Sequence, residues 1–114
     1  MPYLLINTNQ TLDKGTESAL LQECSQAVTM LLGKPERYVM TSIESGITMT
    51  FGGDDSPCAY VELKSLGLPE ARSAEFSQDL CELLSRALNV PMERIYIEFS
   101  SPPRHLWGWN GGTF

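Results

Sequence analysis

The sequence predicts an α/β (α+β) domain in which two helices cover one face of a four-stranded mixed sheet. Two long stretches have apolar residues three and four positions apart, the spacing of an amphipathic helix, and they alternate with short apolar stretches typical of strands. The order of elements in residues 1–57 returns in residues 58–114. Because 114 residues is close to the usual size of one domain, we predict a single domain built as a tandem βαβ repeat.

The first half begins with a strand and continues with a helix. Residues 3–7 form an apolar run of the kind found in strands that are covered on both faces. Residues 17–32 follow the helical spacing, and the apolar residues of one predicted face are Leu20, Leu21, Cys24, Val28, Leu31 and Leu32. Gly33 is a natural stop for this helix, because glycine readily adopts the left-handed conformation that ends many helices.

The other elements follow from the same patterns. We predict a strand at residues 38–44 and a short strand at residues 47–51, after which the turn-forming residues 52–57 close the first half. The second half contains a strand, a helix and a strand at residues 58–64, 69–88 and 95–99. A further short strand is expected near residues 107–109.

The two halves share residues as well as elements. Five pairs of identical residues lie 57 positions apart: Tyr3 and Tyr60, Cys24 and Cys81, Leu31 and Leu88, Glu36 and Glu93, and Arg37 and Arg94. Two such halves would place both helices on one face of the sheet and leave the other face uncovered. Because the predicted strands are apolar, we expect several subunits to assemble in a closed ring with their sheets inside. The two short strands would extend the sheet edge of a neighbouring subunit.

Composition argues against several classes of protein. The net charge of −6, with only eight Lys and Arg residues, is unsuited to binding nucleic acid, which needs clustered positive charge. The chain has neither an apolar stretch long enough to span a membrane nor a secretion signal, so we expect a cytoplasmic protein. The three cysteines (Cys24, Cys58 and Cys81) lack metal-ligand spacing, and the single His105 has no ligand partner nearby in sequence. We therefore expect reduced thiols and no metal site.

Pro2 directly follows Met1, and its role is open on these residues alone. Removal of Met1 before a small residue would leave a proline amine at the mouth of the first strand. A free α-amine titrates near about 7.7 to 8.0, and apolar surroundings lower that pKa toward neutrality, where the nitrogen can act as a base. Alternatively, Pro2 simply starts a strand, at a position that needs no N–H. The residues by themselves favour this structural role over the catalytic one.

Short motifs occur in a fixed order along nearly the whole chain. They are Met1-Pro2, Asn7-Thr8-Asn9, Gly33-Lys34-Pro35, Phe51-Gly52-Gly53, Pro57-Cys58-Ala59, Ser65-Leu66-Gly67, Arg94-Ile95-Tyr96-Ile97, Gly108-Trp109-Asn110 and Thr113-Phe114. Each motif is weak alone, but the ordered set is specific. In these motifs the chain resembles the macrophage migration inhibitory factor and D-dopachrome tautomerase family of the tautomerase superfamily. The resemblance implies a homotrimer with three sites at the subunit interfaces.

The resemblance also implies roles for individual residues. Pro2 matches the base of keto–enol tautomerisation, and Lys34 matches the lysine that binds the substrate. Leu66 matches a position beside the proline that is usually isoleucine, and Tyr96 matches a pocket tyrosine contributed by a neighbouring subunit. Without the resemblance, Tyr96 is a half-buried sheet tyrosine and Lys34 a cation at the end of a helix. The resemblance implies no metal and no organic cofactor.

Three positions depart from the family pattern. Glu98 stands where mammalian members have asparagine, and strand alternation places it on the same side as Tyr96. Trp107 replaces a smaller aliphatic residue at the pocket rim, where it and Tyr38 can supply an aromatic wall. Val61 replaces the second cysteine of a C-A-x-C motif found in some members, so we do not expect the redox activity attributed to that motif.

The predicted activity is a weak keto–enol tautomerase of the phenylpyruvate or dopachrome type, acting on a small aromatic keto or enol acid. A first alternative is a cytokine-like binding protein that keeps the trimer and Pro2 without catalysis, with an unknown receptor and export without a signal peptide. A second is another reaction of the superfamily, such as decarboxylation or hydration of a small acid. The sequence does not separate these alternatives.

Overall fold

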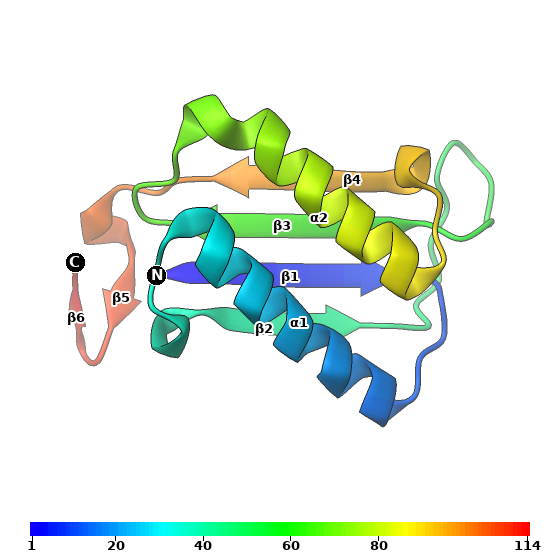
Figure 1. Ribbon diagram of the computed structural model, residues 1–114, viewed down its shortest axis with the longest axis horizontal. Coiled ribbons are helices and arrows are strands. Elements are labelled where there is room, and N and C mark those ends of the chain that lie inside the picture. Colours follow the sequence, from blue (N-terminus) through cyan, green and yellow to red (C-terminus); the bar gives the residue numbers. More distant parts are fainter.

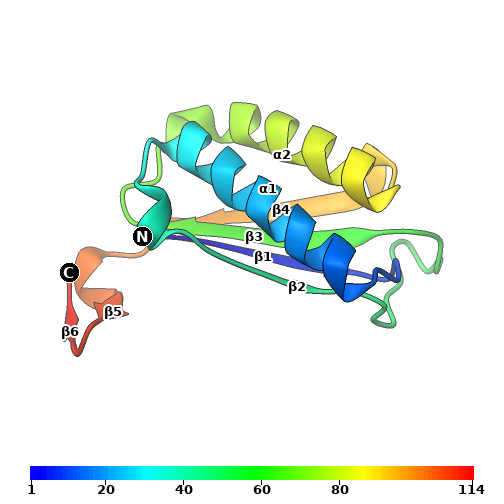
Figure 2. The ribbon, with the colours of Figure 1, turned by 60° about the horizontal axis from the view of Figure 1, so that its bottom comes forward.

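The computed structural model describes residues 1–114 and contains the predicted sheet (Figure 1). The main elements are β1 (Pro2–Thr8), α1 (Lys14–Leu32), β2 (Met40–Glu44), β3 (Ala59–Ser65), α2 (Ser73–Leu88) and β4 (Ile95–Ser100). The sheet has the order β2-β1-β3-β4, with β1 parallel to β2 and antiparallel to β3, and with β3 parallel to β4. Both helices lie on the same face of this mixed sheet (Figure 2). The predicted fold class is confirmed.

The helix ends follow from local hydrogen bonding. Asp13 Oδ1 accepts a bond of 2.7 Å from the backbone N–H of Thr16, so α1 begins at Lys14, earlier than the sequence pattern predicts. The helix ends at Gly33 as predicted, in the left-handed conformation with φ of 64°. The second helix begins later than predicted, because Glu70–Arg72 forms a 3-10 turn ahead of it. No helix has the length and apolar content needed to cross a membrane.

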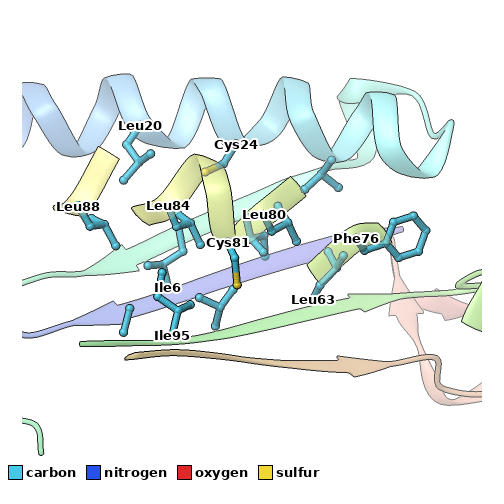
Figure 3. Packing of buried hydrophobic residues seen from close by; sticks show 14 of the residues in the cluster. Ile6, Leu20, Cys24, Leu63, Phe76, Leu80, Cys81, Leu84, Leu88 and Ile95 are labelled. Carbon is cyan, nitrogen blue, oxygen red and sulfur yellow. The ribbon is translucent and has the colours of Figure 1, made fainter. Parts of the chain in front are cut away.

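The core lies between the two helices and the sheet (Figure 3). A cluster of 17 buried residues combines the inward face of each helix with alternate residues of the strands. Figure 3 shows Leu84 of α2 pointing toward the sheet, on the side where Ile6 and Ile95 lie. The three cysteines are free, and all three are buried. This core fixes the sheet whose ends carry the candidate site.

We expect Leu84→Ala to lower the free energy of unfolding by about 2 to 5 kcal/mol, because it leaves a cavity in a close-packed core. Leu84 is 0% exposed. Urea denaturation followed by circular dichroism would measure the change. Met30→Ala is the matched control, since Met30 is 84% exposed and its truncation should leave the midpoint nearly unchanged. Equal midpoints for the two variants would contradict the close packing of Leu84 in the core.

The predicted strand at residues 47–51 is wrong for the single subunit. These residues pair with no other strand, and only Phe51 and Asp54 form an isolated bridge. Their backbones exchange hydrogen bonds of 2.9 and 3.2 Å across Gly52-Gly53, and both glycines have positive φ. The segment is strand-like in sequence, but within the chain its only backbone bond to the sheet is the one that the N–H of Ile47 donates to the carbonyl of Thr8, at 3.2 Å, so no ladder forms.

The short strand predicted near residues 107–109 is confirmed as part of a hairpin. Here β5 (Gly108–Trp109) pairs in antiparallel fashion with β6 (Gly112–Thr113). Figures 1 and 2 show this hairpin projecting beyond the end of the main sheet, close to the N-terminus. Leu106 and Trp109 are 67% and 53% exposed there. The subunit therefore presents apolar side chains beyond the end of its main sheet.

The uncovered face of the sheet is more polar than the apolar strands of the sequence analysis suggest. Burial alternates along β1 and β3, and in β3 the residues on the uncovered face are Tyr60, Glu62 and Lys64. In β4, Tyr96 and Glu98 are both exposed. Apolar burial of this face is thus a weak reason for assembly, and the projecting hairpin is a stronger one.

Candidate active site

Three of the predicted site residues surround one cavity at the end of the sheet where β1 begins. The cavity has a volume of about 340 Å³ and is lined by Pro2, Tyr38 and Trp107 together with Met1, Arg37 and Trp109. A cleft of this volume falls in the range of small-molecule sites, and its walls are mainly hydrophobic, with four aromatic residues among the ten that line it. Pro2 is buried at the first position of β1, opposite Ser65 at the end of β3.

Leu66 and Lys34 lie at the same end of the sheet without lining the cavity itself. Leu66 follows β3 directly and is 5% exposed. A Cβ atom built on Gly67 would lie 4.0 Å from Nζ of Lys34, so the lysine reaches from the end of α1 to the turn after β3. Five of the seven predicted site residues therefore gather at one end of one subunit.

The C-terminal hairpin is fixed against this cavity by aromatic contacts. The rings of Trp109 and Tyr38 meet edge to face with centroids 6.1 Å apart, and the rings of Trp109 and Phe114 stack at 5.8 Å. The backbone N–H of Phe114 donates to the carbonyl of Trp107 at 3.2 Å. Trp107 and Tyr38 were predicted as the aromatic wall, but Trp109 was not, because its exposed place in a two-residue strand gave no signal of its own.

The charge of the chain terminus is disfavoured at this site. Burial, and then the nearby positive charge of Lys34, lower the pKa of the Met1 amine below its ordinary value. In the chain with Met1 present, the nitrogen of Pro2 is an amide and has no basic lone pair. The buried position of Pro2 at the start of β1 suits a purely structural proline. The same surroundings also favour the neutral form of an amine at this place.

Tyr96 lies at the other end of the sheet from this cavity. It is level with Tyr60, which is level with Asn7, five residues along β1 from Pro2. That separation is roughly 17 Å at the rise of an extended strand. In Figure 1, β1 begins at the left and β4 begins at the right. Within one subunit, Tyr96 therefore cannot contact a ligand held at Pro2.

Tyr96 packs against a loop that Arg94 holds by hydrogen bonds. The ring of Tyr96, which is 63% exposed, lies 4.6 Å from the ring of Phe51. The Arg94 guanidinium carbon lies 5.2 Å from the centroid of that Phe51 ring. Arg94 also donates hydrogen bonds of 2.9 to 3.2 Å to the carbonyl oxygens of Phe51, Asp54, Ser56 and Pro57. Residues 52–57 were predicted as a turn and Arg94 as part of a motif, but the bonds between them were not predicted, although the repeat of Glu-Arg at residues 36–37 and 93–94 marked the position.

Glu98 lies on the uncovered sheet face, two residues beyond Tyr96. It accepts a hydrogen bond of 2.8 Å from the phenol of Tyr60 and is level with Glu62. This bond to a carboxylate stabilises the protonated phenol and is the main reason that the pKa of Tyr60 is raised to about 12. Glu98 therefore shares a face with Tyr96, as alternation predicts, and like Tyr96 it is remote from Pro2 of its own subunit.

The cysteines and acidic residues form no second centre. No three His, Cys, Asp or Glu side chains come together in a way that could hold a metal ion. Burial raises the pKa of the Cys24 thiol to about 12, which keeps it protonated and unreactive. Cys58 is 1% exposed, and its carbonyl accepts a 2.8 Å bond from the hydroxyl of Thr8, in keeping with a structural role.

Comparison with known proteins places these features in a family. A family model described as macrophage migration inhibitory factor matches residues 1–114. A macrophage migration inhibitory factor homolog of Brugia malayi is 39% identical, with 100% of this chain and 99% of the relative covered. Macrophage migration inhibitory factor of Mus musculus is 36% identical with the same coverage. The crystal structure of a homologue from Prochlorococcus marinus has a TM-score of 0.92 and 44% identity, and 98% of each chain is covered.

Proposed function

The chain belongs to the macrophage migration inhibitory factor family, and from this premise we propose that it is a weak keto–enol tautomerase of the phenylpyruvate or dopachrome type. The observation that carries the proposal is the cavity of about 340 Å³ that joins Pro2 to the aromatic walls of Tyr38 and Trp107. The substrate class is a small aromatic keto or enol acid. The reaction is an isomerisation, so it needs no oxidant, reductant or organic cofactor.

In the proposed mechanism, Met1 is removed and the neutral amine of Pro2 is the base. The amine takes a proton from the carbon next to the substrate carbonyl, and the electron pair of that bond forms the carbon–carbon double bond of the enol. The carbonyl oxygen accumulates negative charge and receives a proton from the protonated Pro2 amine, which becomes neutral again, and the reverse steps return the keto form. Lys34 would bind the substrate carboxylate, and Leu66 would pack beside the proline.

We further propose that the working unit is a homotrimer with its sheets inside. Two features support it: Leu106 and the hairpin residue Trp109 are exposed beyond the sheet, and Tyr96 is too far from Pro2 to act in its own subunit. A neighbouring subunit would bring Tyr96 to the site and, with it, Glu98. Sedimentation velocity at micromolar concentration tests the assembly. A stable monomer would remove the basis for a site shared between subunits.

Glu98→Asn is expected to raise turnover of phenylpyruvate several-fold near neutral pH. A carboxylate at this position repels an anionic substrate and raises the pKa of the Pro2 amine, and both effects reduce activity. Steady-state kinetics of the ketonisation of enol-phenylpyruvate would measure the change. Glu82→Gln, on the exposed side of α2, makes the same change in net charge and should have no effect. An unchanged rate and pH profile in Glu98→Asn would place Glu98 outside the site.

The second candidate is a non-catalytic, cytokine-like binding protein on the same trimer, with a receptor that is not identified. Membership in the family supports this candidate as well as the enzyme. A third candidate function is decarboxylation or hydration of a small acid by the same site. The experiment that separates them is an assay of the chain whose Met1 removal is verified by intact mass. Turnover of enol-phenylpyruvate supports the tautomerase, whereas a trimer inactive on a panel of enols supports the binding protein. We propose the cytoplasm as its compartment.

A further inference from the structure

Arg37 is an unpaired cation at the mouth of the cavity that contains Pro2. It lines that cavity, and its guanidinium carbon lies 4.7 Å from the centroid of the Tyr38 ring. The four ion pairs of the structure involve Lys14, Lys64, Arg72 and Arg86, and none involves Arg37. No acidic residue lines the cavity. The planar group is therefore held against an aromatic face while its N–H donors have no protein acceptor.

The second half of the chain shows what a guanidinium does at the equivalent position. Arg94 lies 57 residues after Arg37, and each follows a glutamate in a 3-10 turn that leads into a strand. Arg94 packs on the ring of Phe51 and donates to four backbone carbonyl oxygens of the adjacent loop. Arg37 also packs on an aromatic ring, but it faces the cavity, whereas Arg94 faces the loop whose carbonyl oxygens accept its hydrogen bonds. Its donors are therefore available to oxygen atoms of a ligand.

Arg37 and Lys34 approach Pro2 from different sides. Arg37 and Tyr38 lead into β2, which pairs with one edge of β1. The ammonium of Lys34 lies by Gly67 in the turn that follows β3, and β3 pairs with the other edge of β1. A ligand at Pro2 would thus lie between two separate cations. A substrate with one carboxylate can use only one of them fully.

We propose that Arg37 determines specificity by binding a second anionic group of the substrate, so that the preferred ligands are small aromatic acids with an anionic group at each end. The inference rests on the proposed site at Pro2 and narrows its substrate class. A guanidinium can bind a carboxylate through two parallel hydrogen bonds. Because the contact with Tyr38 already restricts the Arg37 side chain, that side chain loses less conformational entropy when it binds a ligand. Lys34 would bind the carboxylate next to the reacting carbonyl as a point charge.

The test compares two acids that cannot react, phenylacetate and 4-carboxyphenylacetate, by isothermal titration calorimetry. The variants are Arg37→Gln, which removes the charge, and Arg37→Lys, which keeps the charge but loses the paired donors. We expect the wild type to bind the diacid at least about fivefold more tightly than the monoacid. Arg37→Gln should make the two affinities equal, and Arg37→Lys should keep part of the preference. Arg86→Gln, which breaks an exposed pair with Glu23 on the helical face, is the control and should keep all of it.

Equal binding of the two acids by the wild type, binding of neither, or an unchanged ratio in Arg37→Gln would overturn the assignment. The result can be told apart from the fate of the proposed catalysis, because binding needs no turnover. A protein without turnover that loses the diacid preference in Arg37→Gln would refute the tautomerase and support the site at Arg37. Turnover that depends on Pro2, together with a diacid preference that is unchanged in Arg37→Gln, would support the tautomerase and refute the site at Arg37.

Discussion

A chain that carries one additional residue ahead of Pro2 is expected to lose its turnover of enol-phenylpyruvate while keeping its fold. Acylation converts the proline nitrogen to an amide, which has no basic lone pair, so the site would keep its walls and lose its base. General base catalysis contributes about 10² to 10⁴ in rate, and we expect a loss of at least about 10²-fold. The measurement is ketonisation by the trimmed and extended chains, with intact mass confirming each N-terminus.

Pro2→Gly is the matched control for that experiment. It leaves a primary amine in place and removes chiefly the rigid placement of the nitrogen, so its loss should be milder than that of the extended chain. Circular dichroism and sedimentation would check that all three proteins have the same fold and assembly. Equal rates in the trimmed and extended chains would make Pro2 a structural residue at the start of β1, and the binding protein would become the favoured function.

The same base gives the reaction an expected pH dependence. If the Pro2 amine is the base, its neutral form is the active one, so kcat/KM should rise with pH through the pKa of the amine and then level off. We expect that pKa to lie below the ordinary value of roughly 7.7 to 8.0, because burial and the charge of Lys34 already lower the pKa of the Met1 amine. Lys34→Gln removes the second cause, so the rise should move to higher pH. Lys14→Gln, fully exposed at the start of α1, should leave the profile in place.

Much of the fold could be predicted because the deciding interactions are local or periodic. The helical spacing, Gly33 and the order of the two halves gave both helices, the four main strands and the face that the helices cover. Residues 47–51 were predicted as a strand because their composition suits one. Whether such a segment pairs depends on a free sheet edge beside it, and that is a property of the tertiary structure.

The candidate site was predicted less completely, for a related reason. Pro2, Tyr38 and Trp107 line one cavity, but periodicity gave no indication that Arg37 and Trp109 join them there. Their positions depend on a 3-10 turn and on a hairpin that packs through aromatic rings. The separation of Tyr96 from Pro2 follows only from the antiparallel pairing of β1 and β3, which the strand patterns alone do not specify.

The separation of Tyr96 from Pro2 leads to a second prediction with a large expected effect. It distinguishes a site within one subunit from a site between two subunits. Tyr96→Ala with an intact Pro2 is expected to lose at least about tenfold in turnover, because a hydroxyl donor to the developing negative charge is removed. The extended chain keeps Tyr96 and lacks the base. Each variant alone should therefore be nearly inactive as a homotrimer.

Mixed trimers of these two variants should regain activity. In any trimer that contains both chains, one of the three interfaces joins a free Pro2 from one subunit to Tyr96 from its neighbour. Random mixing of equal amounts would then restore about one quarter of the wild-type turnover. The chains would be mixed unfolded, refolded together and assayed, with native mass spectrometry verifying that mixed trimers form. If Tyr96 acted on Pro2 of its own subunit, no chain in the mixture would hold both groups. Mixed trimers without regained activity would thus contradict the shared site. Regained activity would mean that Tyr96 acts on Pro2 of a neighbouring subunit, because the two residues lie roughly 17 Å apart along the sheet of one subunit.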